Sequence, residues 1–91
     1  MSITFLIPVF NEAKTVRKAI DEAIEIEIPS KEIIIVDNGS TDGTPEIIKE
    51  YQDHDNIKII LQEKNLGFGN SVKEGFACSS KEFIYLQLLF L

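Results

Sequence analysis

Polar side chains and glycines that could bind a ligand are concentrated in three short stretches of this 91-residue sequence. The stretches cover residues 11–12, 37–43 and 64–69, and each of them follows an apolar run. Carboxylates and amides can hydrogen-bond a base edge or ribose hydroxyls, and glycine lets backbone amides come close to a phosphate group. These residue types predict a nucleotide site, provided that the fold brings the three stretches together.

Apolar runs and amphipathic stretches alternate along the chain, so that three strand-and-helix pairs are followed by a last strand. Residues 33–36 form a continuous β-branched run, which is typical of a strand covered on both faces. This order predicts an α/β fold, a three-layer sandwich of mostly parallel strands with helices on both faces. Ligands bind at the carboxyl ends of the strands in such sheets, so the three polar stretches should open onto one edge.

The bounds of these elements follow from local signals. The expected strands are residues 3–7, 33–36 and 57–61 and a fourth that begins at residue 83. Asn11 is expected to cap the first helix, which should end between residues 25 and 28, and Thr44 to cap the second, with Pro45 in its first position. The inner face of the third helix is predicted from three apolar residues spaced four apart: Phe68, Val72 and Phe76.

The charge balance limits the partners of the chain. Fifteen acidic residues against nine basic ones give a net charge of -6, which offers no attraction to phosphate backbones or anionic lipid. Nucleic acid is therefore excluded as a partner. The apolar start is interrupted by Pro8 and lacks the basic region of a signal peptide, so we expect a cytoplasmic protein, or one at the cytoplasmic face of the membrane in a full-length relative.

The apolar tail and the lone cysteine each suggest a simple structural role. Residues 83–91 are apolar except for Gln87, but a membrane-spanning helix needs about 20 apolar residues. The tail therefore predicts a central strand, and no membrane span is expected. Cys78 can form neither a disulfide framework nor a zinc cluster within the chain, and its small and apolar neighbours predict a buried, reduced thiol.

Several short nucleotide and metal motifs fail on spacing. Gly67 and Gly69 are followed by Val72 where a dinucleotide fingerprint needs a third glycine, and residues 39–44 lack the lysine of a P-loop. The turn after Asp37 lacks the oxygen ligands of an EF-hand loop. A receiver-type signalling domain needs an aspartate after the third strand, and this chain has Gln62 there.

The three polar stretches, taken with the ends of the preceding strands, resemble the N-terminal half of glycosyltransferase family 2. The matching segments are PVFNE at residues 8–12, IIVDNGSTDGT at 34–44 and NLGFG at 65–69. They occur in the family's order and at the expected strand ends, and they span most of the chain. The resemblance implies a GT-A fold in which residues 1–91 form only the N-terminal part of the domain, the part that holds a nucleoside diphosphate sugar.

The same resemblance points to individual nucleotide-sugar-binding residues. They are Pro8, Phe10 and Glu12 after the first strand, Asp37 and Asn38 after the second, and Asn65 and Gly67 after the third. The first five are implied neighbours of the base and ribose. Simpler roles remain open: Asp37 could satisfy its own turn, Glu12 could interact with a helix dipole, and the third stretch could form only a tight turn. No residue is expected to be catalytic.

The sequence departs from the family at the end of the fourth strand. Members carry an Asp-x-Asp motif there that holds Mg²⁺ or Mn²⁺ against the diphosphate, whereas residues 88–91 are Leu-Leu-Phe-Leu, so no metal ligand is expected. The acceptor site and the general base of the family lie beyond this point. Val72 and Lys73 also stand where many members carry arginine and asparagine, which puts a phosphate contact there in doubt.

The resemblance implies an enzyme that transfers a sugar from a UDP-, GDP- or dTDP-sugar to an acceptor by inverting displacement. Because the metal ligands are missing, we expect this chain alone to be inactive. The alternative is a non-catalytic fragment that binds nucleotide or serves as a protein-interaction module, with self-association through the apolar C-terminal strand. The abrupt apolar ending after Gln87 also suggests a truncated or frame-shifted reading frame.

Overall fold

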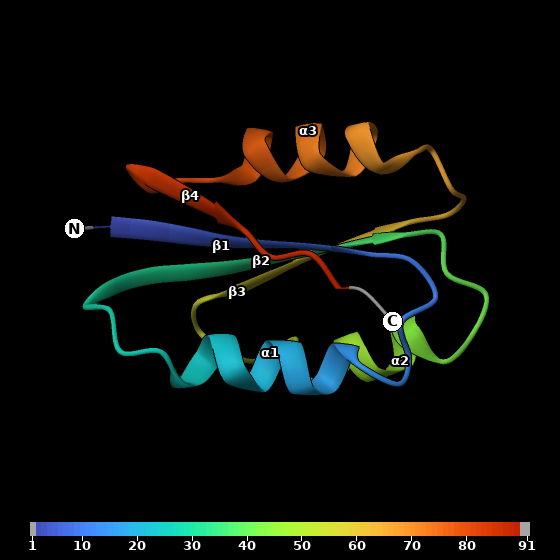
Figure 1. Cartoon of the computed structure of the whole chain (residues 1–91), viewed down its shortest axis with the longest axis horizontal. Coiled ribbons are helices and arrows are strands. Elements are labelled where there is room, and N and C mark those ends of the chain that lie inside the picture. The colour runs from blue at the N-terminus through green and yellow to red at the C-terminus, as the bar shows by residue number, and fades with distance from the viewer. Residues whose placement is uncertain (1, 90–91) are drawn as a thin grey trace.

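The computed structural model describes residues 2–89, which form one parallel four-stranded sheet in the order β3-β2-β1-β4 (Figure 1). The elements are β1 (Ser2–Val9), α1 (Val16–Glu25), β2 (Ser30–Asn38), α2 (Thr44–Lys49), β3 (Ile57–Gln62), α3 (Phe68–Cys78) and β4 (Phe83–Leu86). Figure 1 shows α1 and α2 on one face of the sheet and α3 on the other. The predicted three-layer α/β architecture is confirmed.

Both faces of the two central strands are buried, and this explains the unbroken apolar runs in the sequence. Phe5 and Ile7 of β1 point with Ile33 and Ile35 of β2 into a core that also contains α1 and α2. The intervening side chains form a second, smaller core on the other face of the sheet, beneath α3: Leu6, Ile34 and Val36. Alternating side chains of a strand point to opposite faces, so each strand contributes to both cores.

Helix α3 packs through a different face from the one predicted. Phe68 and Phe76 are 54% and 51% exposed, whereas Ser71 and Gly75 are buried and Val72 is partly buried against the second core. A Cβ atom at position 75 would collide with the side chain of Leu6, so glycine permits this close approach of helix to sheet. Residues four apart drift by about 40° around a helix at each step, so they do not form one narrow face.

Two predicted helix starts are also corrected. Helix α1 begins at Val16, after a turn in which the Glu12 carbonyl accepts hydrogen bonds from the amides of Thr15 and Val16 at 3.0 and 2.8 Å. Asn11 is therefore no cap, and it adopts a left-handed conformation with φ 51°. Thr44 is the first residue of α2, and the side chain of Asp42 accepts its amide hydrogen bond at 2.9 Å. Pro45 is therefore the second residue of the helix and not the first, although it still lies in the first turn.

The end of the described chain differs from its prediction in two further ways. Strand β4 lies at the edge of the sheet and not at its centre, and within residues 2–89 it pairs with β1 alone. The predicted strand extended to residue 91, but β4 ends at Leu86, and residues 90–91 lie outside the described part. Cys78, the last residue of α3, is exposed and not buried. Among the described helices none is long and apolar enough to cross a membrane.

A buried carboxylate ties together the amino edge of the sheet, opposite the polar loops. Glu32 of β2 is only 5% exposed and accepts hydrogen bonds from the Thr4 hydroxyl at 2.6 Å and the Ser80 amide at 2.7 Å. The Lys58 ammonium lies 2.9 Å from its other oxygen. Burial alone raises the pKa of Glu32, but the hydrogen bonds from Thr4, Ser80 and Lys58 outweigh burial and lower the pKa to about 2. This cluster fixes the loop between α3 and β4 to the three other strands.

Glu32→Gln should lower the free energy of unfolding at pH 7 by about 1–3 kcal/mol, because an amide cannot accept all these hydrogen bonds as an anion does. The folded pKa of about 2 lies below the ordinary 4.5, so this stabilisation is complete above about pH 4.5 and is lost as the pH falls toward 2. Urea unfolding should therefore show a difference between wild type and variant that shrinks by about half between pH 7 and pH 3.

The exposed Glu22→Gln is the matched control and should change stability by less than about 0.5 kcal/mol at either pH. A Glu32→Gln effect of equal size at both pH values would contradict the assignment of the stabilisation to the ionised carboxylate.

Candidate functional site

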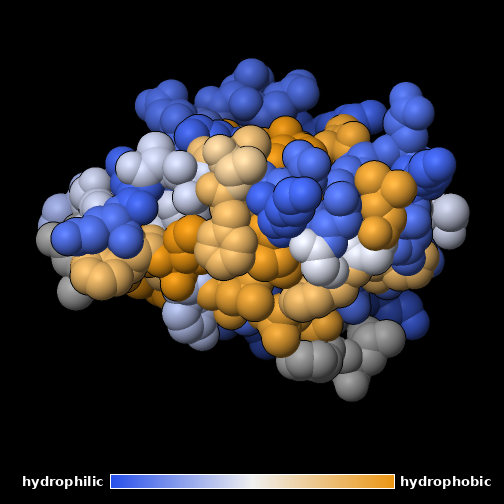
Figure 2. Space-filling view, turned by 90° about the horizontal axis from the view of Figure 1, so that it is seen from above, coloured by the Kyte–Doolittle hydropathy of each residue, from blue (hydrophilic) through white to orange (hydrophobic). Residues whose placement is uncertain are grey.

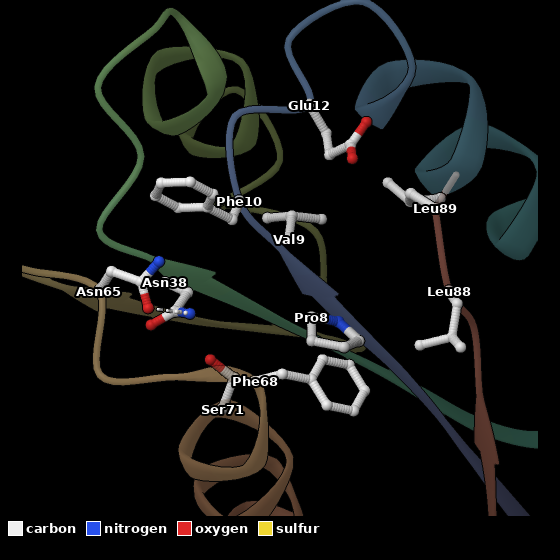
Figure 3. A pocket seen from close by; sticks show the side chains of 10 residues that line it. All are labelled: Pro8, Val9, Phe10, Glu12, Asn38, Asn65, Phe68, Ser71, Leu88 and Leu89. Atoms are coloured by element: carbon white, nitrogen blue, oxygen red, sulfur yellow. Dashed lines mark hydrogen bonds between the residues drawn. The ribbon is translucent and has the colours of Figure 1, made fainter. Parts of the chain in front are cut away.

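A cavity of about 500 Å³ lies at the carboxyl edge of the sheet, where β1, β2 and β3 end (Figure 3). Its lining combines residues from the ends of β1 and β2, from three loops and from the start of α3: Pro8, Val9, Phe10, Glu12, Asn38, Asn65, Phe68, Ser71, Leu88 and Leu89. The three polar stretches of the sequence do meet at one edge, as predicted. Figure 3 shows Asn38 and Asn65 on one side of β1 and Leu88 and Leu89 on the other.

Hydrogen bonds between the first two loops hold this edge together. The Asn11 amide donates to the Ser40 hydroxyl at 2.8 Å, and the Asn11 side-chain oxygen accepts from the Thr41 amide at the same distance. The Glu12 amide donates to the Thr44 hydroxyl oxygen at 3.0 Å. Asn11 adopts positive φ more readily than most residues, which allows both of its contacts. The loops after β1 and β2 therefore support each other, and Phe10 and Glu12 are held at the cavity.

Asp37 is not among the residues that line the cavity. Its side chain is only 1% exposed, and its two carboxylate oxygens accept hydrogen bonds from the Ser40 amide at 3.0 Å and the Ser40 hydroxyl at 2.6 Å. These two hydrogen bonds stabilise the turn that follows β2, which is the simpler role that the sequence left open for Asp37. Its contact with a base or ribose stays a prediction.

Asn38 joins the third loop to the end of β2. Its amide nitrogen donates to the Asn65 side-chain oxygen at 2.9 Å, and its own oxygen accepts from the Leu66 amide at 2.9 Å. The Asn65 oxygen also accepts from the Gly67 amide at 2.8 Å. With its oxygen used in this way, Asn65 turns its amide nitrogen toward Phe10 in Figure 3. A hydrogen-bond donor and an aromatic ring are thereby brought to the same end of the cavity.

Gly39 is a residue whose role the sequence did not single out. It has φ 74°, and a Cβ atom there would collide with the backbone of Lys64 and Asn65. The second and third loops can therefore touch only because position 39 is glycine. Gly67 also has a positive φ, 95°, and precedes α3, but nothing lies within 4 Å of a Cβ built there and it does not line the cavity. Its predicted contact with a nucleotide remains untested.

Five lining residues were not predicted: Val9, Phe68, Ser71, Leu88 and Leu89. Phe68 was assigned to the buried face of its helix, although its place at the start of α3 brings it to the carboxyl edge. Ser71 is buried beside it, and its hydroxyl bonds the side-chain oxygen of Gln62 at 3.3 Å, which anchors α3 to β3. The apolar residues 88–89 did not indicate a ligand site in the sequence, and only the fold shows that they line one side of the cavity.

The cavity does not fit the divalent metal that the family resemblance implies. Glu12 is the single carboxylate in the lining, and one of its oxygens already accepts from the Thr15 hydroxyl at 2.9 Å. Mg²⁺ and Mn²⁺ need several oxygen ligands, whereas Leu88 and Leu89 offer only carbon. Residues 2–89 contain no group of three or more His, Cys, Asp or Glu side chains that could hold a metal ion. Within residues 2–89 the cavity therefore does not supply the donor set that Mg²⁺ or Mn²⁺ needs, and use of the metal by a full-length relative stays an expectation.

Comparison with known proteins finds a family model and curated relatives that match most of the chain. The model of the family "Glycosyl transferase family 2" matches residues 4–87. A poly-beta-1,6-N-acetyl-D-glucosamine synthase from Staphylococcus epidermidis is 38% identical over 82 residues, which is 90% of this chain and 20% of that protein. The chain thus spans about a fifth of the length of the curated relatives it matches.

Solved structures share the fold at lower identity. Staphylococcus aureus TarS in complex with UDP-GlcNAc superposes with a TM-score of 0.86 at 24% identity, over 97% of this chain and 26% of that one. A mannosyltransferase from Pyrobaculum calidifontis in complex with GDP-Man and Mn²⁺ has a TM-score of 0.86 at 22% identity, over 94% of this chain and 26% of that one.

Proposed function

The chain belongs to glycosyl transferase family 2, and from this membership we propose that its cavity binds the nucleotide part of a nucleotide-sugar donor. The expected GT-A fold is confirmed by the structural neighbours. Residues 1–91 would then be the N-terminal, donor-binding part of a longer transferase domain. Transfer of the sugar to an acceptor is the proposed activity of that longer protein.

The observation that carries the proposal is the pairing of Phe10 with Asn65 at one end of the cavity. Phe10 is 41% exposed and lines the cavity, so we propose that a planar base stacks on its ring. The Asn65 amide nitrogen, on the same side, can donate to an oxygen or nitrogen on the edge of that base. The volume of about 500 Å³ lies within the range of small-molecule sites.

The relatives suggest which donors to try. The TarS complex contains UDP-GlcNAc and the mannosyltransferase complex contains GDP-Man, so UDP-, GDP- and dTDP-sugars are the proposed donor classes. Pro8, Glu12 and Asn38 complete the proposed binding surface around the base and ribose, since they line the same cavity. Asn38 acts mainly by holding Asn65 in place.

Phe10→Ala should weaken nucleotide binding by about tenfold, because a stacked aromatic ring contributes roughly 1–3 kcal/mol per base. Isothermal titration calorimetry with UDP, GDP and dTDP on the purified chain measures the effect. Phe76→Ala is the matched control, since Phe76 is also exposed but lies on α3 outside the cavity lining, and its affinity should equal that of the wild type. Absence of heat with all three nucleotides, for a folded sample, would refute the proposed function.

We also propose that the chain by itself does not transfer sugar. Glu12 is the one ionisable side chain in the cavity lining, and the lining supplies no cation to stabilise a leaving diphosphate. Incubation with UDP-, GDP- and dTDP-sugars, Mn²⁺ and a mixture of acceptors should yield no glycoside above a heat-denatured control. Product formation by the purified chain would show that the catalytic groups are present after all.

A second candidate function, interaction with another copy of the chain, is favoured by the outer edge of β4, which has no partner strand within residues 2–89. Figure 2 looks down on the α3 side and shows hydrophobic side chains gathered in a band across this face. The exposed hydrophobic side chains of β4 itself are Phe83, Tyr85 and Leu86, and the ring of Tyr85 contacts that of Phe5 on the α1 and α2 side of the sheet. Strand β4 contains no charged residue or proline, the usual features that block pairing at an edge. Two copies related by a two-fold axis could pair their β4 strands into one continuous sheet.

Sedimentation equilibrium tests this second function. The chain should shift from its 10.3 kDa monomer toward twice that mass as concentration rises, and Phe83→Lys should remain monomeric because a lysine at the edge opposes pairing. Ile26→Lys changes an equally exposed apolar residue of another surface and should leave the shift intact. A monomer at all concentrations would exclude self-association through β4.

A further inference from the structure

The cavity has an unusual chemical composition for a site that would hold a diphosphate. Six of its ten lining residues are apolar, three carry amide or hydroxyl groups, and only Glu12 carries a charge. A nucleoside diphosphate brings about two to three negative charges. The Glu12 carboxylate, the one charged group of the lining, would repel these charges. The composition fits the uncharged part of a nucleotide better than its phosphates.

No basic side chain replaces the missing metal at this edge. Arg17 of α1 pairs with Glu50, the residue that follows α2, at 2.7 Å. Lys18 borders a separate depression on the other side of Leu89, where Glu22 lies beside it. Lys64 precedes Asn65 in the third loop but borders another depression together with Glu63 and Glu74. These three cations lie outside the lining of the cavity, and each has acidic side chains beside it.

The aliphatic wall opposite the amides is fixed in place. Leu88 and Leu89 are separated from β4 only by Gln87, whose amide continues the pairing with β1 by donating to the Leu6 carbonyl at 2.9 Å. Leu89 packs against the main hydrophobic core. In Figure 3 these two leucines lie across β1 from Asn38 and Asn65. A nucleotide whose base contacts Phe10 and Asn65 would thus direct its phosphates toward leucine side chains or into solvent.

We infer that this cavity recognises the nucleoside end of a nucleotide through stacking and neutral hydrogen bonds, without a divalent cation. The inference rests on the proposed function and sharpens it: the base and ribose supply the affinity, and the diphosphate adds nothing to it. The chain therefore differs from the metal-dependent donor binding that the family resemblance implies.

Titration of the purified chain with uridine, UDP, guanosine and GDP, each with excess Mn²⁺ and with EDTA, tests the inference. For the base that binds, the nucleoside should bind within about threefold of its diphosphate or more tightly, and Mn²⁺ should change either affinity by less than about twofold. Tightening of diphosphate binding by tenfold or more with Mn²⁺ would overturn the inference while leaving the proposed function intact. Failure of all four ligands to bind would overturn the proposed function as well.

A substitution that removes the charge of Glu12 but keeps the size of its side chain tests the repulsion between this carboxylate and the phosphates. Glu12→Gln should raise the ratio of diphosphate affinity to nucleoside affinity by about threefold to tenfold, since it removes the one negative charge of the lining. Glu22→Gln, which removes an exposed carboxylate outside this cavity, should leave the ratio at its wild-type value. An unchanged ratio in Glu12→Gln would show that the carboxylate does not act on the phosphates and would count against the inference.

Discussion

Parallel pairing of β1 with β2 and of β2 with β3 is the constraint on which the site depends. The register places Val9 beside Asp37, and Asp37 beside Leu61, so three strands end at one level and their loops leave the sheet together. Within that arrangement the loops are joined by specific contacts, such as Asn11 with Ser40 and Asn38 with Asn65. The cavity therefore forms because several strands end at the same edge, and no single loop could form it alone.

The two edges of the sheet use polar groups in different ways. At the amino edge the Glu32 carboxylate of β2 accepts from donors on the two neighbouring strands and on a loop, so its hydrogen-bonding groups are satisfied within the fold. At the carboxyl edge the ring of Phe10 and the amide of Asn65 are exposed toward the cavity. Buried polar groups stabilise a structure when their partners are present, whereas groups left open at a cavity are available to a ligand. This contrast supports assignment of ligand binding to the carboxyl edge.

Sequence patterns predicted the order of strands and helices because buried parallel strands require apolar runs and loops require turn residues. They also predicted that Phe10, Glu12, Asn38 and Asn65 would meet, since parallel strands end at one edge. They could not predict the packed face of α3, which depends on the contact of Gly75 with Leu6 across a long sequence separation. The contribution of Leu88 and Leu89 to the cavity lining could not be predicted from the sequence either, because apolar residue types do not by themselves indicate a ligand site.

Mapping of nucleotide binding by amide chemical shifts tests the central claim most directly. In ¹H–¹⁵N spectra of the labelled chain, the nucleotide that binds should shift the backbone amides of Phe10, Asn38 and Asn65 and their loop neighbours. The amide of Ser80 at the opposite edge and those of β4 should stay in place. Shifts confined to β4 and the outer face of α3, with none at the three loops, would contradict the assignment of the cavity as the nucleotide site.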